Sequence, residues 1–128
     1  MVTQRATERS PGPSPALEAV LGEVTSLGVL VPDPDEVRVY LSEHPDMADL
    51  TRRVCAKAMA RLGTAAQVSL EVYRDPEADE EDLAVYFRQR QYDEGIMAAI
   101  DGVWPEYARD LANTSGYIML TTDFQPPR

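Results

Sequence analysis

Hydrophobic and polar side chains alternate more regularly over residues 66–90 than anywhere else in the chain. In both halves of this stretch every second residue is apolar: Val68, Leu70 and Val72, then Leu83, Val85 and Phe87. A period of two is typical of a half-buried β-strand, because successive side chains point to opposite faces of the sheet. The pattern therefore predicts a β-hairpin with one apolar face.

An acidic stretch, Asp75 to Asp82, separates the two predicted strands and holds six acidic residues among its eight. So dense a charge cannot be buried, which predicts an exposed turn. Folding the hairpin symmetrically about this stretch pairs Val72 with Val85. Leu70 then lies opposite Phe87, and all four apolar side chains share one face, which other elements must cover.

The same register gathers polar and aromatic side chains on the opposite face of the hairpin. Glu71 lies near Tyr86, and Ser69 lies near Arg88. Tyr and Arg together on a sheet can stack on RNA bases, but ordinary cross-strand pairing also produces this combination. We expect this face to contact a protein partner or to be covered by the N-terminal helix. Its candidate partner-binding residues are Glu71, Tyr73, Tyr86, Arg88 and Arg90.

Apolar residues at helical spacing predict helices on both sides of the hairpin, over residues 16–28, 34–43, 45–62 and 91–113. Asp33 followed by Pro34 forms a helix start. The helix that begins there should stop at His44, because a residue before proline disfavours the helical conformation. Pro105 cannot donate a backbone hydrogen bond, so the last helix should kink there or divide into two.

Residues 117–122 (YIMLTT) read as a final strand with apolar side chains on both faces, which is typical of a strand covered on both sides. The predicted fold class is α+β, in the order α-α-α-β-β-α-β. Its sheet is small, three-stranded and mainly antiparallel, with helices packed on one face. We expect the last strand to lie beside the first hairpin strand, which would make the sheet fully antiparallel. The exposed edges of such a sheet favour a homodimer.

The length fits one domain, residues 16–128, preceded by a polar, proline-rich leader over residues 1–15 that we expect to be disordered. The net charge is −10 and the pI about 4.4. This charge argues against nucleic-acid binding and favours a basic protein partner. A single cysteine and the lack of any long apolar run predict a cytoplasmic protein without a membrane segment.

The sequence offers few residues for catalysis. His44 is the only histidine and Cys55 the only cysteine, and they fall on different predicted helices with no third group to orient them. We therefore expect Cys55 to fill the core and His44 to lie at a helix junction. One cysteine and one histidine are too few for a zinc site, and the phosphate-loop, dinucleotide, serine-hydrolase and zinc-protease motifs are absent. No cofactor is expected.

The acidic turn is the remaining candidate metal site, because carboxylate oxygens bind Ca²⁺ and Mg²⁺. Its candidate ligands are Asp75, Glu77 and Asp79. However, the turn lacks the glycine and the ligand spacing of an EF-hand, and its carboxylates repel one another. We therefore expect a solvated turn in which Asp75 accepts hydrogen bonds from backbone amides, and we assign no metal.

Two motifs carry a resemblance to known proteins: Tyr73-Arg74-Asp75-Pro76-Glu77, and the stretch from Gly116 to Phe124 (GYIMLTTDF). Over residues 33–128 the chain resembles an uncharacterised family of small prokaryotic hypothetical proteins. The resemblance implies no activity, cofactor or catalytic residue. Small acidic proteins of this kind are often one half of a two-protein module such as a toxin and its antitoxin.

Two functions follow from these observations. The first is a non-enzymatic binding or regulatory protein, antitoxin-like or immunity-like, whose partner is basic. The net charge and the acidic turn favour it. The second is a metal-dependent or acid/base enzyme that uses Asp75, Glu77 and the neighbouring acidic residues.

Overall fold

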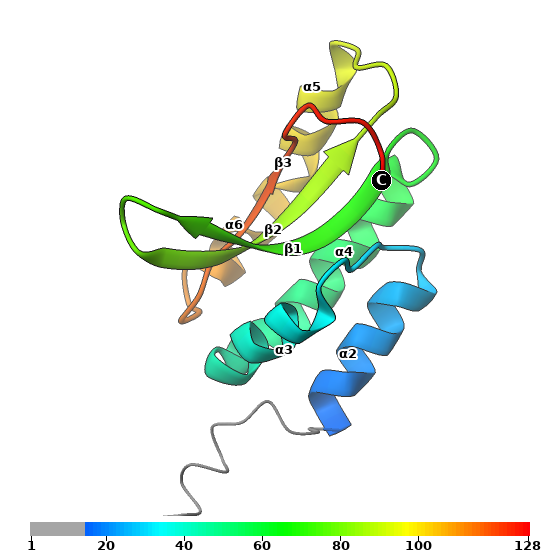
Figure 1. The fold of residues 1–128 in the computed structure, drawn as a ribbon. Coiled ribbons are helices and arrows are strands. Elements are labelled where there is room, and N and C mark those ends of the chain that lie inside the picture. The colour runs from blue at the N-terminus through cyan, green and yellow to red at the C-terminus, as the bar shows by residue number, and fades with distance from the viewer. Residues whose placement is uncertain (1–14) are drawn as a thin grey trace, which may run out of the picture.

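The computed structural model describes residues 15–128, so the predicted leader lies outside the described residues except for Pro15, where the first helix begins. The described chain forms a three-stranded sheet with helices packed on one face (Figure 1). Helices α3 (Pro34–Glu43) and α4 (Ala48–Leu62) pack against the sheet, and α2 (Pro15–Ser26) packs on α4 and α3. The predicted α+β class and order of elements are therefore confirmed.

Local capping signals define the helices as predicted. The side chain of Asp33 accepts a hydrogen bond from the backbone N–H of Glu36 at 3.2 Å, and α3 ends at Glu43, directly before His44. A short 3₁₀ helix, η1 (Pro45–Met47), leads into α4. The last predicted helix is divided at Pro105 into α5 (Gly95–Val103) and α6 (Pro105–Leu111), which was one of the two predicted outcomes.

The core lies between the sheet and the helices. The apolar stripe of α4 is buried at Leu50, Val54, Ala58 and Leu62, and the odd-numbered apolar residues of β2 are fully buried. Cys55 is also fully buried, as its predicted role as a core filler requires. The hairpin face predicted to be apolar is therefore the face that the helices cover.

The hairpin register differs from the predicted one by two residues. Strands β1 (Gln67–Asp75) and β2 (Glu80–Arg88) place Val72 opposite Leu83 and Leu70 opposite Val85. Only residues 76–79 form the turn, because acidic residues continue the ladder, where Glu81 pairs with Arg74 at 2.6 Å. A shift of two keeps every side chain on its predicted face, so the face assignment is confirmed although the pairing was wrong.

The predicted position of the last strand was also wrong. Strand β3 (Ile118–Thr121) lies beside β2, not β1, and runs parallel to it, so the sheet is mixed. The physical reason is the helical connection through α5 and α6, which is the usual link between parallel strands. The free edge of β1 is partly occupied by Leu30, which forms a bridge with Ser69.

Candidate functional site

The hairpin turn is strongly acidic, and hydrogen bonds hold its backbone at one end of the molecule (Figure 1). The side chain of Asp75 accepts a hydrogen bond from the backbone N–H of Glu77 at 2.9 Å, as predicted. The backbone N–H of Asp79 donates to the carbonyl of Asp75 at 3.0 Å, and Asp79 adopts a positive φ of 54°. The carboxylates of the turn are therefore held on a fixed backbone.

The turn forms one wall of a groove of about 590 Å³ whose other side includes His44, at the end of α3. Residues of the hairpin line the rest of it: Arg74, Asp75, Pro76, Asp79, Glu80 and Glu81. Arg74 bridges Glu36 and Glu81, which leaves the remaining carboxylates of the groove without an ion pair among residues 15–128. The groove is therefore negatively charged.

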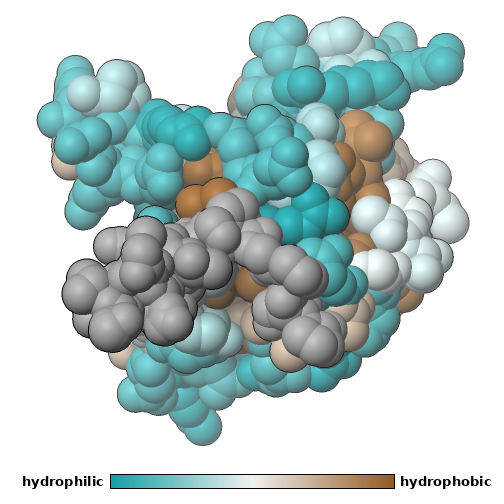
Figure 2. All heavy atoms as spheres, turned by 60° about the horizontal axis from the view of Figure 1, so that its bottom comes forward, coloured by the Kyte–Doolittle hydropathy of each residue, from teal (hydrophilic) through white to brown (hydrophobic). Residues whose placement is uncertain are grey.

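Charge at this end is dense enough to affect a neighbouring acid. Partial burial raises the pKa of the Asp82 carboxyl, and the negative charges of Glu80 and Asp75 raise it further. The hairpin lobe, at the left of Figures 1 and 2, presents an almost entirely hydrophilic surface. A cationic group placed in the groove would relieve the repulsion among these carboxylates.

Basic side chains elsewhere in the molecule are largely neutralised. Within residues 15–128 every Lys and Arg side chain is in an ion pair, except those of Arg90 and Arg109. In contrast, four carboxylates in the hairpin turn and directly beside it have no ion pair in the same part of the chain: Asp75, Glu77, Asp79 and Glu80. Residues 75–80 are therefore the densest group of carboxylates without an ion pair, although seven others are spread over the rest of the described chain: Asp33, Glu43, Asp46, Asp82, Asp93, Glu94 and Asp101.

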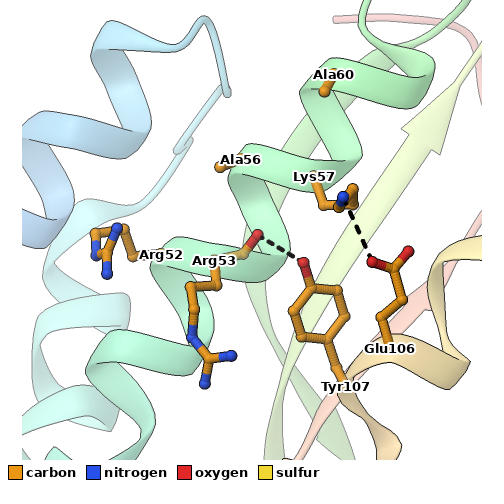
Figure 3. A pocket seen from close by; sticks show the side chains of 7 residues that line it. All are labelled: Arg52, Arg53, Ala56, Lys57, Ala60, Glu106 and Tyr107. Carbon is orange, nitrogen blue, oxygen red and sulfur yellow. Dashed lines mark hydrogen bonds and ion pairs between the residues drawn. The ribbon is translucent and has the colours of Figure 1, made fainter.

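The basic side chains of α4 illustrate this neutralisation (Figure 3). It borders a groove between α4 and α6, where Lys57 lies 3.4 Å from Glu106. Arg53 pairs with Asp110 at 3.0 Å, and Tyr107 donates its hydroxyl proton to the backbone carbonyl of Arg53 at 3.2 Å. These contacts attach α6 to α4 and leave little free positive charge in the groove.

No metal centre is formed by the candidate ligands. In the described part of the chain, no group of three or more His, Cys, Asp or Glu side chains is arranged to hold a metal ion. The carboxylates of Asp75, Glu77 and Asp79 lie in or beside the turn, and one oxygen of the Asp75 carboxylate accepts a hydrogen bond from the backbone N–H of Glu77. The chemistry that the turn offers is attraction of cationic side chains.

Beside the groove, hydrogen bonds join His44 and Asp46 to Ser115. The sequence did not predict this junction. The hydroxyl of Ser115 donates to one carboxylate oxygen of Asp46 at 2.7 Å, and its backbone N–H donates to the other at 2.8 Å. With its only proton used, that hydroxyl accepts from Nδ1–H of His44 at 2.9 Å. Both bonds from Ser115 lower the pKa of the Asp46 carboxyl. His44 thus lies at a helix junction, as predicted, with its ring fixed.

The junction continues through Tyr40, whose ring lies 4.5 Å from that of His44. Its hydroxyl accepts from the backbone N–H of Tyr117 at 2.9 Å and lies 3.3 Å from the carbonyl of the same residue. The His-Pro-Asp and Ser-Gly-Tyr segments that meet here are separated by 69 residues between Asp46 and Ser115. Nothing in either segment alone indicates the other.

The candidate partner-binding residues of the polar sheet face are distributed unevenly. Glu71 and Arg88 form an ion pair at 2.9 Å, and the guanidinium lies 4.7 Å from the ring centre of Tyr86. Tyr73 lies farther along the hairpin, opposite Asp82, and is 39% exposed. Arg90 is exposed beyond the end of β2. The structure therefore brings three of the five together and leaves two apart.

Cys55 cannot act as a nucleophile with His44. It is fully buried, and burial raises the pKa of its thiol to about 12. We expect no labelling of native protein by a thiol reagent such as 5,5′-dithiobis(2-nitrobenzoate), and complete labelling in denaturant. A fast reaction of native protein would contradict this placement.

No protein-family model, curated protein or solved structure matches the chain. Within residues 15–128, none of the helices combines the length and the apolar character needed to cross a membrane. Any function must therefore be inferred from the side chains of the protein itself.

Proposed function

We propose that this is a non-enzymatic binding protein whose acidic hairpin end binds a basic segment of a protein partner, in the manner of an antitoxin or immunity protein. The observation that supports the proposal is the distribution of charge. Basic side chains of the described chain are mostly paired internally, whereas carboxylates of the hairpin turn are not. A basic partner would supply the counter-charges that this end lacks.

The groove between the turn and His44 gives the proposal a specific geometry. Its carboxylates stand on a backbone fixed by the Asp75 side chain, so little ordering is needed on binding. An arginine or lysine side chain of the partner would enter between Asp79 and Glu80 on one side and His44 on the other. Such a contact is electrostatic, so it should accelerate association and weaken with salt.

A matched pair of variants tests the proposal. The probe is a fluorescein-labelled peptide of alternating lysine and serine, titrated by fluorescence anisotropy at low ionic strength. Replacing Glu77 and Glu80 by glutamine should weaken binding about fivefold, since each removed charge contributes up to about 1 kcal/mol. Both side chains are exposed and lie in or beside the turn, so the fold should be unaffected.

The control removes the same charge elsewhere, through Glu94→Gln with Asp101→Asn, two exposed acids near α5. This variant should bind the peptide within about twofold of the unmodified chain. At about 1 M salt, where the Debye length is about 3 Å, the difference between the two variants should disappear. Equal weakening by both pairs of substitutions would show that net charge, and not the hairpin end, attracts the peptide.

A further inference from the structure

The segment Asp123–Arg128, here called the strap, crosses the sheet at the end of the hairpin where Gln67 pairs with Arg88. Figure 1 shows it running from the end of β3 past β2 to the start of β1. It forms no strand, and its bonds to the rest of the described chain pass through side chains. The backbone N–H and C=O of Arg128 bond to the side-chain amide of Gln67 at 2.9 and 3.1 Å.

Arg88 forms a socket for the strap. Its side chain is only 1% exposed. A guanidinium group is rarely buried in this way unless carboxylates pair with it. Nη2 donates to Asp123 at 2.8 Å and Nε donates to the same carboxylate at 3.1 Å. Nη1 donates to Glu71 at 2.9 Å, and the ring of Tyr86 lies against the guanidinium. One of the two carboxylates that this buried cation needs therefore comes from the strap.

Few contacts hold the strap, and its backbone is strained at Phe124. Phe124 adopts a positive φ of 58°, a conformation that a residue with a bulky side chain rarely takes. Phe124 is 61% exposed, and the centre of its ring lies 5.1 Å from that of the Tyr92 ring. Apart from Asp123 and Gln67, the strap is held by two side chains. The hydroxyl of Tyr92 donates to the carbonyl of Gln125 at 2.6 Å, and Glu71 lies 3.7 Å from the guanidinium of Arg128. Segments held by a few side chains open more readily than ladders of backbone bonds.

We propose that the sheet face around Arg88 is a docking site for an extended, carboxylate-bearing segment of a partner protein, and that the strap occupies this site in cis. The strap itself shows which chemistry fits: a carboxylate on Arg88 and, farther along an extended chain, a backbone amide on Gln67. A partner segment must displace the strap, which therefore limits binding. This face is separate from the acidic groove and does not depend on the function proposed for it.

The test uses the full chain and a labelled, end-capped peptide with the sequence of residues 122–128. In the Asp123→Ala variant the strap loses its anchor, and the socket becomes available. We expect this variant to bind the peptide at least about tenfold more tightly than the unmodified chain, because the tethered strap no longer competes. A peptide with alanine in place of the aspartate should bind neither protein. Equal binding of the peptide to both chains, or equal binding of the two peptides, would overturn the proposal.

A second variant covers the case in which Asp123→Ala does not fold. Tyr92→Phe removes the bonds to Gln125 and Thr122 but keeps the pair between Arg88 and Asp123. It should bind the peptide about threefold more tightly than the unmodified chain. The matched control is Tyr107→Phe, which removes a hydroxyl on α6 that contacts only α4. Binding by Tyr92→Phe no tighter than by this control would contradict the proposal.

Discussion

Replacing Arg88 by methionine should lower the free energy of unfolding by about 3 kcal/mol. The guanidinium is 1% exposed, and its removal leaves the carboxylates of Glu71 and Asp123 facing each other without a cation. Because these carboxylates keep 20% and 32% of their side-chain exposure, water compensates part of the loss. Urea denaturation of both proteins measures the difference.

Arg90→Met is the matched control, since Arg90 is exposed and is in no ion pair within residues 15–128. It should change stability by less than about 0.5 kcal/mol.

The loss of stability caused by Arg88→Met should also depend on pH. Hydrogen bonds from Arg88 lower the pKa of the Asp123 carboxyl below its ordinary value of 3.8. The pair therefore stabilises the fold above that value, and its contribution is lost as the pH falls through the lowered pKa. If the stability lost through Arg88→Met instead increased as the pH fell, the pair assigned to Arg88 and Asp123 would be contradicted.

Gly116→Ala should destabilise the protein by about 2–3 kcal/mol, because no space exists for a methyl group. An added Cβ would lie 2.4 Å from the hydroxyl of Tyr40 and 3.1 Å from Cγ of Met47. The hydroxyl cannot move aside without losing its bond from the backbone N–H of Tyr117. Thermal and urea denaturation would measure the loss.

Gly22→Ala is the opposite case and serves as the control. Gly22 lies inside α2, and an added Cβ there would meet nothing within 4 Å. Alanine is the better helix former, so this variant should be more stable by up to about 1 kcal/mol. If both substitutions shifted stability in the same direction, the close approach between Gly116 and Tyr40 would not be what limits that position.

Signals that act over a few residues were readable from the sequence. The Asp33 cap, the stop before Pro45 and the division at Pro105 each depend on neighbouring residues, and each was found where expected. The faces of the hairpin were also correct, because a period of two assigns faces whatever the register. The register was wrong because acidic residues were assigned wholly to the turn, whereas Glu81 continues the ladder by pairing with Arg74.

Features that join distant segments were not readable. The alternation in residues 117–122 indicates a strand but not its neighbour, and β3 lies beside β2 because a helical crossover connects them. Ser115 and Asp46 meet across 69 residues, and Asp123 reaches Arg88 across 35. The sequence does not indicate which distant residue a polar side chain in a loop will contact. For this reason the sequence did not indicate that the strap covers Arg88.

The parallel pairing of β2 with β3 has a consequence for synthesis of the protein. A chain emerging from the ribosome completes the hairpin before residues 118–121 and Asp123 have been made. Until then the edge of β2 that will pair with β3 is open beside Leu83 and Val85, and Arg88 lacks one of its two carboxylates. Domains generally fold as units, and unpaired strand edges invite aggregation. Nascent chains stalled before β3 should therefore be the species that chaperones and proteases meet.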